Sequence, residues 1–254
     1  MKFETKHLSS KLYLVIFLLF ISLYACKKDS NTDSSNTDMG YDYYPIALGS
    51  WYIYSVDSTV HDDFTDSVYT LSYQIKEIYA DTFTDNEGRL SYKIGRYKRD
   101  SDSSQWTISD IWYVTKTTNH IERIEEDVRY EPFIFPPQNE TEWNLNSFNN
   151  YNVYTVWERH QTWQETAVEI EVKDTLVDKT FVLDTITSYE HTVTIWHDYQ
   201  TYISDEQYHA VYAKNIGLVY KQMIYYYSDD TTDVPFLERI TYGVSYTQKL
   251  ISYG

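Results

Sequence analysis

The sequence predicts an all-β fold, most simply a single antiparallel meander that curls into a sandwich or an open barrel. Beyond residue 40, Tyr is the dominant aromatic residue and Thr, Val and Ile are frequent, while the whole chain has only 7 Gly and 5 Pro. Such side chains pack well on a pleated, half-buried surface. Many segments also alternate apolar and polar residues with a period of two, and helical periods are scarce. These observations favour strands over helices.

The clearest strands form one hairpin. In VYTLSYQIKEIY (residues 68–79), every second residue from Tyr69 to Ile75 is aromatic or aliphatic, and the residues between them are polar. This is the pattern of a strand with one face in water. RLSYKIGRYKR (residues 89–99) repeats it, and Gly88 in the intervening TDNEGR can adopt the left-handed conformation of a short loop. The two segments are therefore expected to pair.

The rest of the domain is expected to consist of similar strands, rich in β-branched and aromatic residues. They are expected at residues 50–58, 106–116, 120–130, 151–160, 166–174, 179–187, 191–203, 217–227 and 244–253. The three consecutive tyrosines at 225–227 cannot all face one way on a strand.

One short helix is expected near residues 204–213. Ser204, followed by the acidic and amide residues 205–207, resembles a capping box, and QYHAVYA supplies the turns behind it. The sequence NIG at 215–217 would end the helix.

The stretch FPPQNETEWNLNSFNN (residues 135–150) has no period. Its two prolines and its polar run predict a long loop that crosses from one set of strands to the next. Long loops on β scaffolds often bind ligands, although a plain crossover is the simpler interpretation.

Residues 1–25 have the pattern of a signal peptide. Three lysines outnumber one glutamate before an apolar run that begins at Leu12. The run lasts about 14 residues, whereas a helix needs about 20 to cross a bilayer, so a signal peptide is favoured over a transmembrane span.

The apolar run ends in LYAC (residues 23–26), which resembles the lipobox of bacterial lipoproteins. In a lipobox the chain is cleaved before the cysteine, here between Ala25 and Cys26, and the cysteine is acylated. We therefore expect Cys26 to carry the lipid. The several acyl chains of this modification would hold the protein stably on a membrane, whereas a single chain would not. A free buried cysteine is the alternative, which the polar residues after it disfavour. Cys26 is the only cysteine, so no disulfide is expected in the mature chain.

The segment after the cysteine predicts a tether. KKDSNTDSSNTDMG (residues 27–40) has almost no apolar residue, so burial cannot offset the entropy of ordering it. We expect residues 26–40 to be acylated cysteine and flexible tether, and residues 41–254 to be one all-β domain. The acidic tract also resembles the export signals of Bacteroidetes surface lipoproteins, which favours the surface side of the outer membrane. The sequence alone does not decide between the periplasmic and the surface side.

The charge excludes one class of partner. The formal net charge is −17, and residues 1–25 are basic, so the mature chain would be more acidic still. The negative electrostatic potential of such a chain repels phosphate backbones, and nucleic acid is therefore not an expected partner. Solubility and spacing from an anionic membrane explain the charge without a cationic ligand.

No pattern predicts catalysis or metal binding. The histidines are scattered, and the chain has no HExxH, GxSxG or phosphate-binding glycine loop. His61 with Asp62 and Asp63, and the stretch SDDTTD (residues 228–233), resemble solvated turns more than calcium loops. The acidic residues 125–127 resemble a charged strand end more than a glycosidase pair. We expect no catalytic residue, no metal and no cofactor.

Five Asp-Ser or Asp-Thr triplets resemble the acceptor of the Bacteroidetes O-glycosylation system. Their acceptor residues are Ser58, Ser67, Thr175, Thr185 and Thr231. Asp and Thr are also common where strands meet turns, so these triplets have a structural explanation as well.

The aromatic residues are in surplus, with 28 Tyr and 7 Trp. They could line a hydrophobic cup or stack on sugar rings, although core packing in an all-β domain also favours aromatic residues.

Five segments of the chain carry a family resemblance. They are YYPIALGSWYIYSVDST, SYQIKEIY, GRLSYKIGRYKR, YAKNIGLVYKQ and YTQKLISYG. With the signal peptide and the tether, they resemble a group of Bacteroidetes outer-membrane lipoproteins. The resemblance implies an envelope location and this chain plan, and it brings no activity and no catalytic residues.

The preferred hypothesis is a membrane-anchored envelope lipoprotein with a non-enzymatic β-rich binding or structural domain. One alternative is a carrier of a lipid or small hydrophobic ligand in a curved-sheet cavity, by fold analogy only. Another is a glycan-binding or glycan-hydrolysing surface protein. The expected partners are the membrane, through the lipid anchor, and a protein, glycan or hydrophobic small molecule.

Overall fold

The structure is a computed structural model that describes part of the chain. The described residues are 38–148, 153–154, 163–164, 171–172 and 174–254. Contacts divide the chain into the units Met1–Thr37 and Asp38–Gly254, and every described residue belongs to the second. The predicted signal peptide, Ala25, Cys26 and most of the predicted tether therefore lie outside the described residues.

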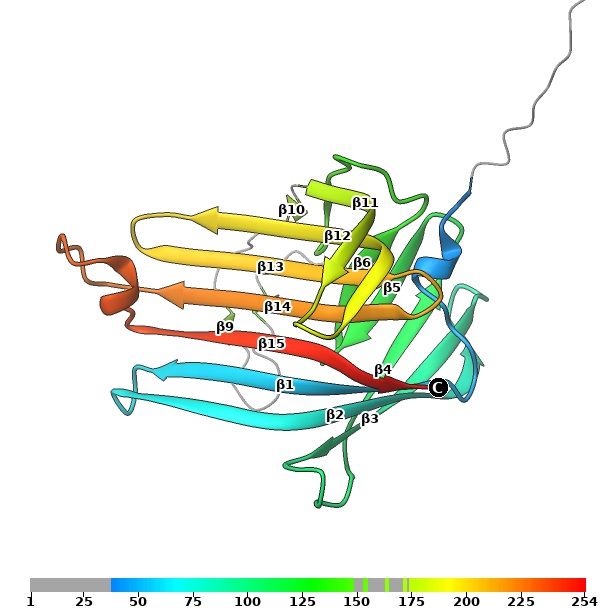
Figure 1. Cartoon of the computed structure of the whole chain (residues 1–254), viewed down its shortest axis with the longest axis horizontal. Coiled ribbons are helices and arrows are strands. Elements are labelled where there is room, and N and C mark those ends of the chain that lie inside the picture. The colour runs from blue at the N-terminus through cyan, green and yellow to red at the C-terminus, as the bar shows by residue number, and fades with distance from the viewer. Residues whose placement is uncertain (1–37, 149–152, 155–162, 165–170, 173) are drawn as a thin grey trace, which may run out of the picture. The chain divides into compact units, whose positions relative to one another are not determined.

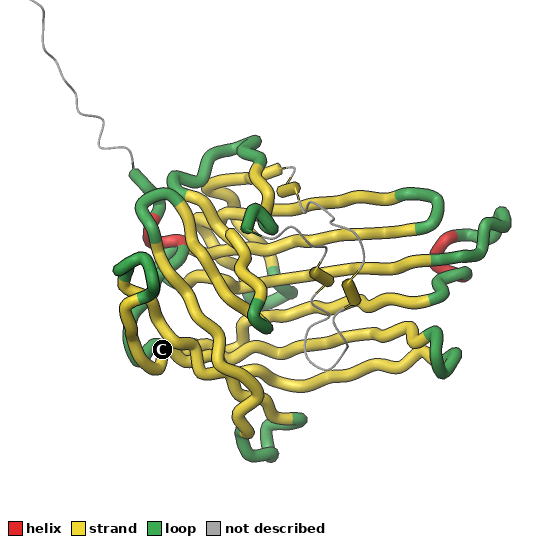
Figure 2. The backbone as a smooth tube through the Cα atoms, turned by 180° about the vertical axis from the view of Figure 1, so that it is seen from behind, coloured by secondary structure: helices red, strands yellow, loops and turns green. Residues whose placement is uncertain are grey.

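Eleven strands form one curled antiparallel sheet (Figures 1 and 2). The first six are β1 (Trp51–Asp62), β2 (Ser67–Thr84), β3 (Leu90–Arg99), β4 (Thr107–Lys116), β5 (His120–Glu125) and β6 (Val128–Ile134). The other five are β11 (Asp174–Val182), β12 (Ser188–Gln200), β13 (Ser204–Ala213), β14 (Gly217–Tyr227) and β15 (Tyr242–Tyr253).

The sheet consists of two meanders that share one seam. Each strand pairs with the next strand of its own group, and the antiparallel β1–β15 pair joins the two groups. β6 and β11 are the two edges of the half-barrel. The predicted all-β meander that curls into an open barrel is confirmed, and so is the predicted β2–β3 hairpin.

The remaining described elements are small. They are β7 (Trp143–Asn144), β8 (Val153–Tyr154), β9 (Trp163–Gln164), β10 (Glu171–Val172) and the 3-10 turns η1 (Tyr41–Tyr43) and η2 (Phe236–Glu238). β7 pairs with β10, and β8 pairs with β9. Among the described residues, no helix has the length and apolar character needed to span a membrane.

The alternation of side chains builds the interior of the half-barrel. On β1, Tyr52, Tyr54 and Val56 are buried and the residues between them are less so. On β2, Tyr73 and Ile75 are buried in the same way, which confirms the predicted apolar face of this strand. The buried apolar residues form a large cluster and a smaller one, and partly buried Met223 packs against both.

The predicted helix near residues 204–213 is wrong, because Ser204–Ala213 is strand β13. β13 pairs along its length with β12 and β14. The period of two that places Tyr208, Ala210 and Tyr212 on one buried face outweighs the local capping signal at Ser204. Tertiary pairing here overrides a helix propensity that is weak on its own.

Two predicted strand boundaries also differ from the structure. The segment predicted as one strand at 120–130 is the β5–β6 hairpin, in which Glu126 and Asp127 both have positive φ angles and make the turn. The segment predicted at 179–187 is the end of β11 followed by a turn. The predicted strands at 151–160 and 166–174 lie mostly outside the described residues.

The predicted crossing loop joins the two edges of the sheet. We call its residues 136–147 the strap. At the β6 edge, the strap receives the hydrogen bond from Glu131 N to Leu145 O, and Trp143 Nε1 donates to Glu131 O at 2.8 Å. At the β11 edge, Glu140 N donates to Thr175 O and Thr175 Oγ1 donates to Thr141 O, both at 2.9 Å. The strap therefore satisfies edge groups that would otherwise be unpaired.

The two ends of the sheet differ. The β1–β2, β12–β13 and β14–β15 connections lie at one end, which we call the loop end and which is on the left in Figure 1. The chain enters the domain at the opposite end, the entry end. There, Tyr41 Oη donates to Thr118 O at 2.8 Å, and Asn215 N donates to Asp42 O at 2.7 Å.

Candidate functional site

Five ionisable side chains gather inside the half-barrel. Glu77 on β2, Arg96 on β3, Arg123 and Glu125 on β5, and Lys221 on β14 line one small cavity. The four residues on β2, β3 and β5 are each less than 9% exposed, and the Lys221 side chain is 12% exposed. We call these five residues the ionic cluster.

Strand register explains why residues so far apart in sequence meet. Glu77 lies between Ile75 and Tyr79 in the alternation of β2, so its side chain points inward with theirs. Arg96 is the direct cross-strand partner of Glu77. The curl of the sheet then brings Lys221 on β14 to the same cavity.

Arg123 is the centre of the ionic cluster. Its Nη2 donates to Glu77 Oε1 at 2.7 Å, and its Nε lies 2.5 Å from Glu125 Oε1. Arg96 Nε lies 3.6 Å from the same Glu77 oxygen, and Lys221 Nζ lies 4.0 Å from Glu125 Oε2. Three cations thus surround two carboxylates.

An indole ring supports the two arginines. The guanidinium carbons of Arg96 and Arg123 lie 4.1 and 5.1 Å from the ring centre of Trp112 on β4. Cation–π contacts of this kind become stronger when the charge is removed from water. Trp112 is itself 4% exposed, and its Nε1 donates to Glu126 Oε1 at 3.4 Å.

Burial and pairing set the protonation of the cluster. Burial alone would raise the pKa of Glu77, but Arg123 and Arg96 outweigh it and hold that pKa below its ordinary value. Burial lowers the pKa of Lys221, and the carboxylate of Glu125 opposes this shift only in part. Burial would lower the pKa of Arg123 as well, but Glu77 and Glu125 raise it well above the usual value.

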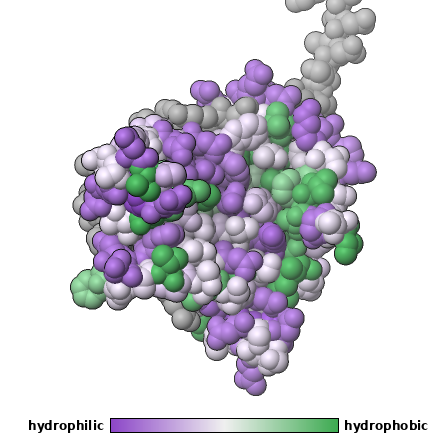
Figure 3. All heavy atoms as spheres, turned by 60° about the vertical axis from the view of Figure 1, so that its left-hand side comes forward, coloured by the Kyte–Doolittle hydropathy of each residue, from purple (hydrophilic) through white to green (hydrophobic). Residues whose placement is uncertain are grey.

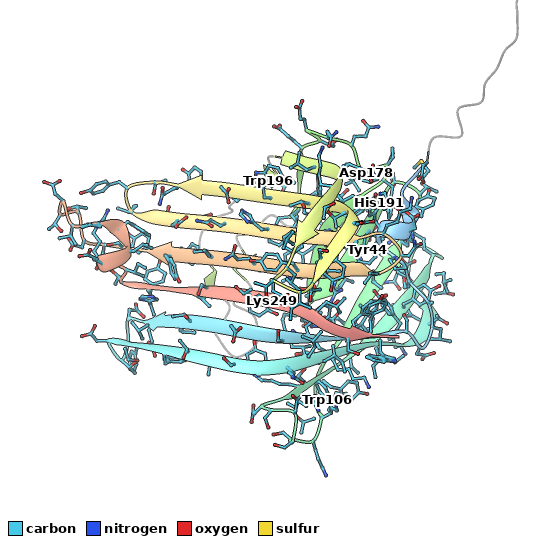
Figure 4. All side chains as sticks on the ribbon, in the orientation of Figure 1. Tyr44, Trp106, Asp178, His191, Trp196 and Lys249 are labelled. Atoms are coloured by element: carbon cyan, nitrogen blue, oxygen red, sulfur yellow. The ribbon has the colours of Figure 1, made fainter. Side chains whose placement is uncertain are left out.

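The cavity beside the cluster is small. Tyr44, Tyr208, Tyr212 and Gln248 also line it. Its volume is about 30 Å³, which is room for about two water molecules. Tyr44 packs against Tyr212 with ring centres 5.6 Å apart, near the right-hand ends of β13 and β14 in Figure 4.

The five side chains of the ionic cluster are paired with one another and are not set apart as glycoside hydrolysis requires. A glycosidase needs one carboxyl group held protonated as an acid, whereas the pKa of Glu77 is lowered and Arg123 contacts both carboxylates. The cluster also lies between the two apolar clusters, because Tyr246, a member of the smaller one, lines the same cavity. Within the described ranges, no three His, Cys, Asp or Glu side chains are placed to hold a metal ion.

The predicted glycosylation residues are distributed unevenly. Ser58 is 7% exposed in β1, and Thr175 is 1% exposed and donates to Thr141 O from its place in β11. Ser67, Thr185 and Thr231 are exposed, on β2, in the β11–β12 turn and in the β14–β15 loop respectively. The predicted lipidation residue Cys26 lies outside the described residues.

The two acidic stretches that were compared with calcium loops lie at the same end of the sheet, although they are far apart in sequence. Asp62 and Asp63 lie at the end of β1, and the stretch 228–233 lies in the β14–β15 loop. Both are therefore at the loop end. Asp62 accepts hydrogen bonds from Phe64 N and from the Thr65 hydroxyl, as in a tight turn.

The surplus tryptophans serve more than one purpose. Trp112 is part of the interior, whereas Trp106 in the β3–β4 connection stacks on Arg99 at 4.4 Å and lies low in Figure 4. The predicted explanation by core packing therefore holds for Trp112.

Sequence reasoning missed the ionic cluster. The signal was present, because Glu77 and Arg96 occupy the inward positions of alternating segments that were recognised as strands. A charged residue at an apolar position in such a pattern indicates a buried partner of opposite charge.

No protein-family model matches the chain, and no curated protein matches it.

Proposed function

We propose that the chain is an outer-membrane lipoprotein of the cell envelope, anchored through Cys26, whose β domain binds or supports a partner without catalysing a reaction. One observation carries the proposal. The five residues of the ionic cluster are paired with one another. At the loop end, the exposed carboxylates of Asp63 and Asp233 make no side-chain hydrogen bond or ion pair with the described part of the chain. A β scaffold whose interior charges are paired and whose loops are exposed at one end is typical of proteins that bind partners through loops.

The lipobox-like sequence supports the membrane anchor. Cys26 follows a basic and apolar segment and precedes a polar stretch, which is the order expected of a signal peptide, an acylated cysteine and a tether. The cavity beside the ionic cluster does not favour the carrier alternative, since ligand pockets usually have about 300–1,000 Å³.

Metabolic labelling tests the anchor. Cells that express the full chain receive a clickable fatty acid, and the labelled protein is followed in membrane and soluble fractions. Wild type should carry label and sediment with the outer membrane, and Cys26→Ala should do neither. Ser35→Ala, a change in the same tract, is the control and should behave as wild type. Label on Cys26→Ala would contradict the proposed anchor.

Native mass spectrometry tests the absence of a carried ligand. The chain is purified from the envelope of its own host, and its mass is compared with the mass after denaturation. A single protein mass supports the binding or structural module. A bound lipid that is released on denaturation would replace it with the carrier alternative, and a bound glycan would favour the glycan alternative.

A further inference from the structure

Three connections form one surface at the loop end. They are the β1–β2 turn (residues 63–66), the β12–β13 turn (residues 201–203) and the β14–β15 loop (residues 228–241). Strand pairing places them together, because His61 is opposite Gly243 and Ser204 is opposite Tyr227. We call these three connections, with Asp62, the loop-end surface.

Arg239 links two of the three connections, the β12–β13 turn and the β14–β15 loop. The residue is 8% exposed, and its guanidinium donates to the carbonyl oxygens of Val234 (3.0 Å), Tyr202 (2.5 Å) and Asp230. It also stacks on the rings of Tyr202 and Phe236 at 4.5 and 5.3 Å. Arg239 is the one Lys or Arg residue of the loop-end surface, and it is bonded within the surface. It therefore connects the β12–β13 turn to the β14–β15 loop.

Apolar side chains stand out from all three connections. Phe64 is 93% exposed, Leu237 68%, Tyr202 53% and Val234 42%. In Figure 3, which brings the left-hand side of Figure 1 forward, small hydrophobic patches lie among hydrophilic residues. Exposed aromatic and aliphatic side chains that gather on one surface are typical of protein contacts.

Acidic residues occur in the same connections as these apolar side chains. The loop-end surface contains seven carboxylates, at Asp62, Asp63, Asp66, Asp229, Asp230, Asp233 and Glu238. Four of them are exposed and make no side-chain hydrogen bond or ion pair with the described part of the chain; these are Asp63, Asp66, Asp233 and Glu238. Their repulsion remains unless a cation approaches from outside.

We propose that the loop-end surface docks a basic, amphipathic segment of another protein. Apolar side chains of the partner would cover Phe64 and Leu237, and its Lys or Arg residues would pair with the four exposed carboxylates. This inference rests on the proposed binding role and names its partner class. Charge complementarity excludes the two other occupants, because an anionic lipid surface and a second copy of this acidic chain would both be repelled.

A synthetic peptide tests the inference. The probe is a fluorescent peptide of about 16 residues that alternates Lys and Leu. It is titrated against the full chain in zwitterionic lipid nanodiscs, and binding to empty nanodiscs is subtracted. Wild type should bind it, and the affinity should fall by at least tenfold when the NaCl concentration rises from about 50 to 500 mM.

Paired variants locate the binding. Phe64→Ser with Leu237→Ser should weaken binding at least tenfold, whereas Ile186→Ser should leave it unchanged, because Ile186 is 92% exposed in the β11–β12 turn at the other end of β12. Asp63→Asn with Asp233→Asn should weaken binding similarly, and Asp100→Asn in the β3–β4 connection should not. All of these side chains are exposed, so circular dichroism should report an unchanged fold.

Three outcomes would overturn the inference. The first is no binding by wild type, and the second is equal loss in the control variants, which would indicate diffuse charge attraction. The third is a blue-shifted emission of an environment-sensitive dye at Phe64→Cys in nanodiscs without peptide, which would indicate lipid contact. Label on Cys26→Ala or a co-purified lipid bears on the proposed function instead, so the two failures can be told apart.

Discussion

Arg123 is the residue on which the charge balance of the buried ionic cluster depends. It contacts the carboxylates of both Glu77 and Glu125, and it stacks on Trp112. An ion pair removed from water contributes little net stability as a whole, but the loss of one partner leaves an uncompensated charge in the interior. The ionic cluster therefore matters chiefly through what happens when it is incomplete.

Replacing Arg123 should show this effect. Arg123→Met is expected to lower the free energy of unfolding by about 3–5 kcal/mol, because two carboxylates lose their shared partner. Lys93→Met is the matched control, since Lys93 and Asp81 form a pair whose side chains are 41% and 64% exposed. That change should alter the free energy of unfolding only slightly, because solvent screens an exposed pair. Urea unfolding at pH 7 measures both, and equal losses would contradict a central role for Arg123.

Glu77 should make the stability depend on pH. Its pKa in the folded protein lies below the ordinary value of 4.5, so its contribution is fully present above that value and is lost as the pH falls through the folded-state pKa. Glu77→Gln should be less stable than wild type at pH 7, and the difference should shrink below about pH 4.5.

Unfolding midpoints measured from pH 7 to pH 3 test this expectation. Glu87→Gln is the control, because the side chain of Glu87 is 62% exposed and its change should give a small difference with little pH dependence. A gap between Glu77→Gln and wild type that stays constant to pH 3 would argue against an ionised Glu77 in the folded protein.

Among the secondary-structure elements and their connections, the strap is the one that covers the edges of the sheet. An open half-barrel has two edge strands, and unpaired edges invite association with other chains. Residues 136–147 reach both edges, so backbone groups of β6 and β11 are hydrogen bonded without a closed barrel. The structure gives the predicted crossing loop a specific purpose, namely the protection of both edges.

Weakening the strap should loosen the edges locally. Trp143→Phe with Thr175→Val removes one hydrogen bond at each edge, and each loss should cost about 1 kcal/mol. Amide hydrogen exchange should rise in β6 and β11 and stay unchanged in β1 and β2. Ser72→Ala, which removes an exposed hydrogen bond to Asp57, is the control. Uniformly faster exchange would mean that the strap stabilises the whole fold instead of its edges.

The elements also show what could be predicted from the sequence. Composition and period-two patterns identified most strands of the sheet, because a one-sided strand displays its buried face in the order of its residues. β5 and β6 were predicted as one strand, and only the end of β11 was predicted. Residues 204–213 were mistaken for a helix, since a capping signal is local and the β12 and β14 partners of this strand are not. The inward positions of Glu77 and Arg96 indicate buried charges, but the sequence does not identify all their partners, because only the curl of the sheet brings Lys221 to Arg123.

At the scale of the whole molecule, charge repulsion acts against the fold. The chain has a formal net charge of −17, and the buried ionic cluster offsets only its own charges. Salt screens repulsion between exposed groups strongly and interactions between buried groups weakly. The balance between the two should therefore be visible in the ionic-strength dependence of stability.

Added salt should stabilise this protein. When NaCl rises from about 20 to 500 mM, the screening length falls from about 20 Å to about 4 Å, so the melting temperature should increase. Differential scanning calorimetry measures the change, and a variant with Asp63→Asn and Asp66→Asn should show a smaller increase. A fall in melting temperature with salt would mean that attractive surface pairs outweigh the repulsion.

The position of the entry end gives the molecule a direction. The first described residues pack on the β4–β5 and β13–β14 turns, at the end of the sheet opposite Phe64 and Leu237. β1 alone spans 12 residues, or about 40 Å from one end to the other. Asp38 and the loop-end surface are thus separated by the length of the sheet. A protein bound at the loop-end surface would leave the contacts of Tyr41 and Asp42 at the entry end uncovered.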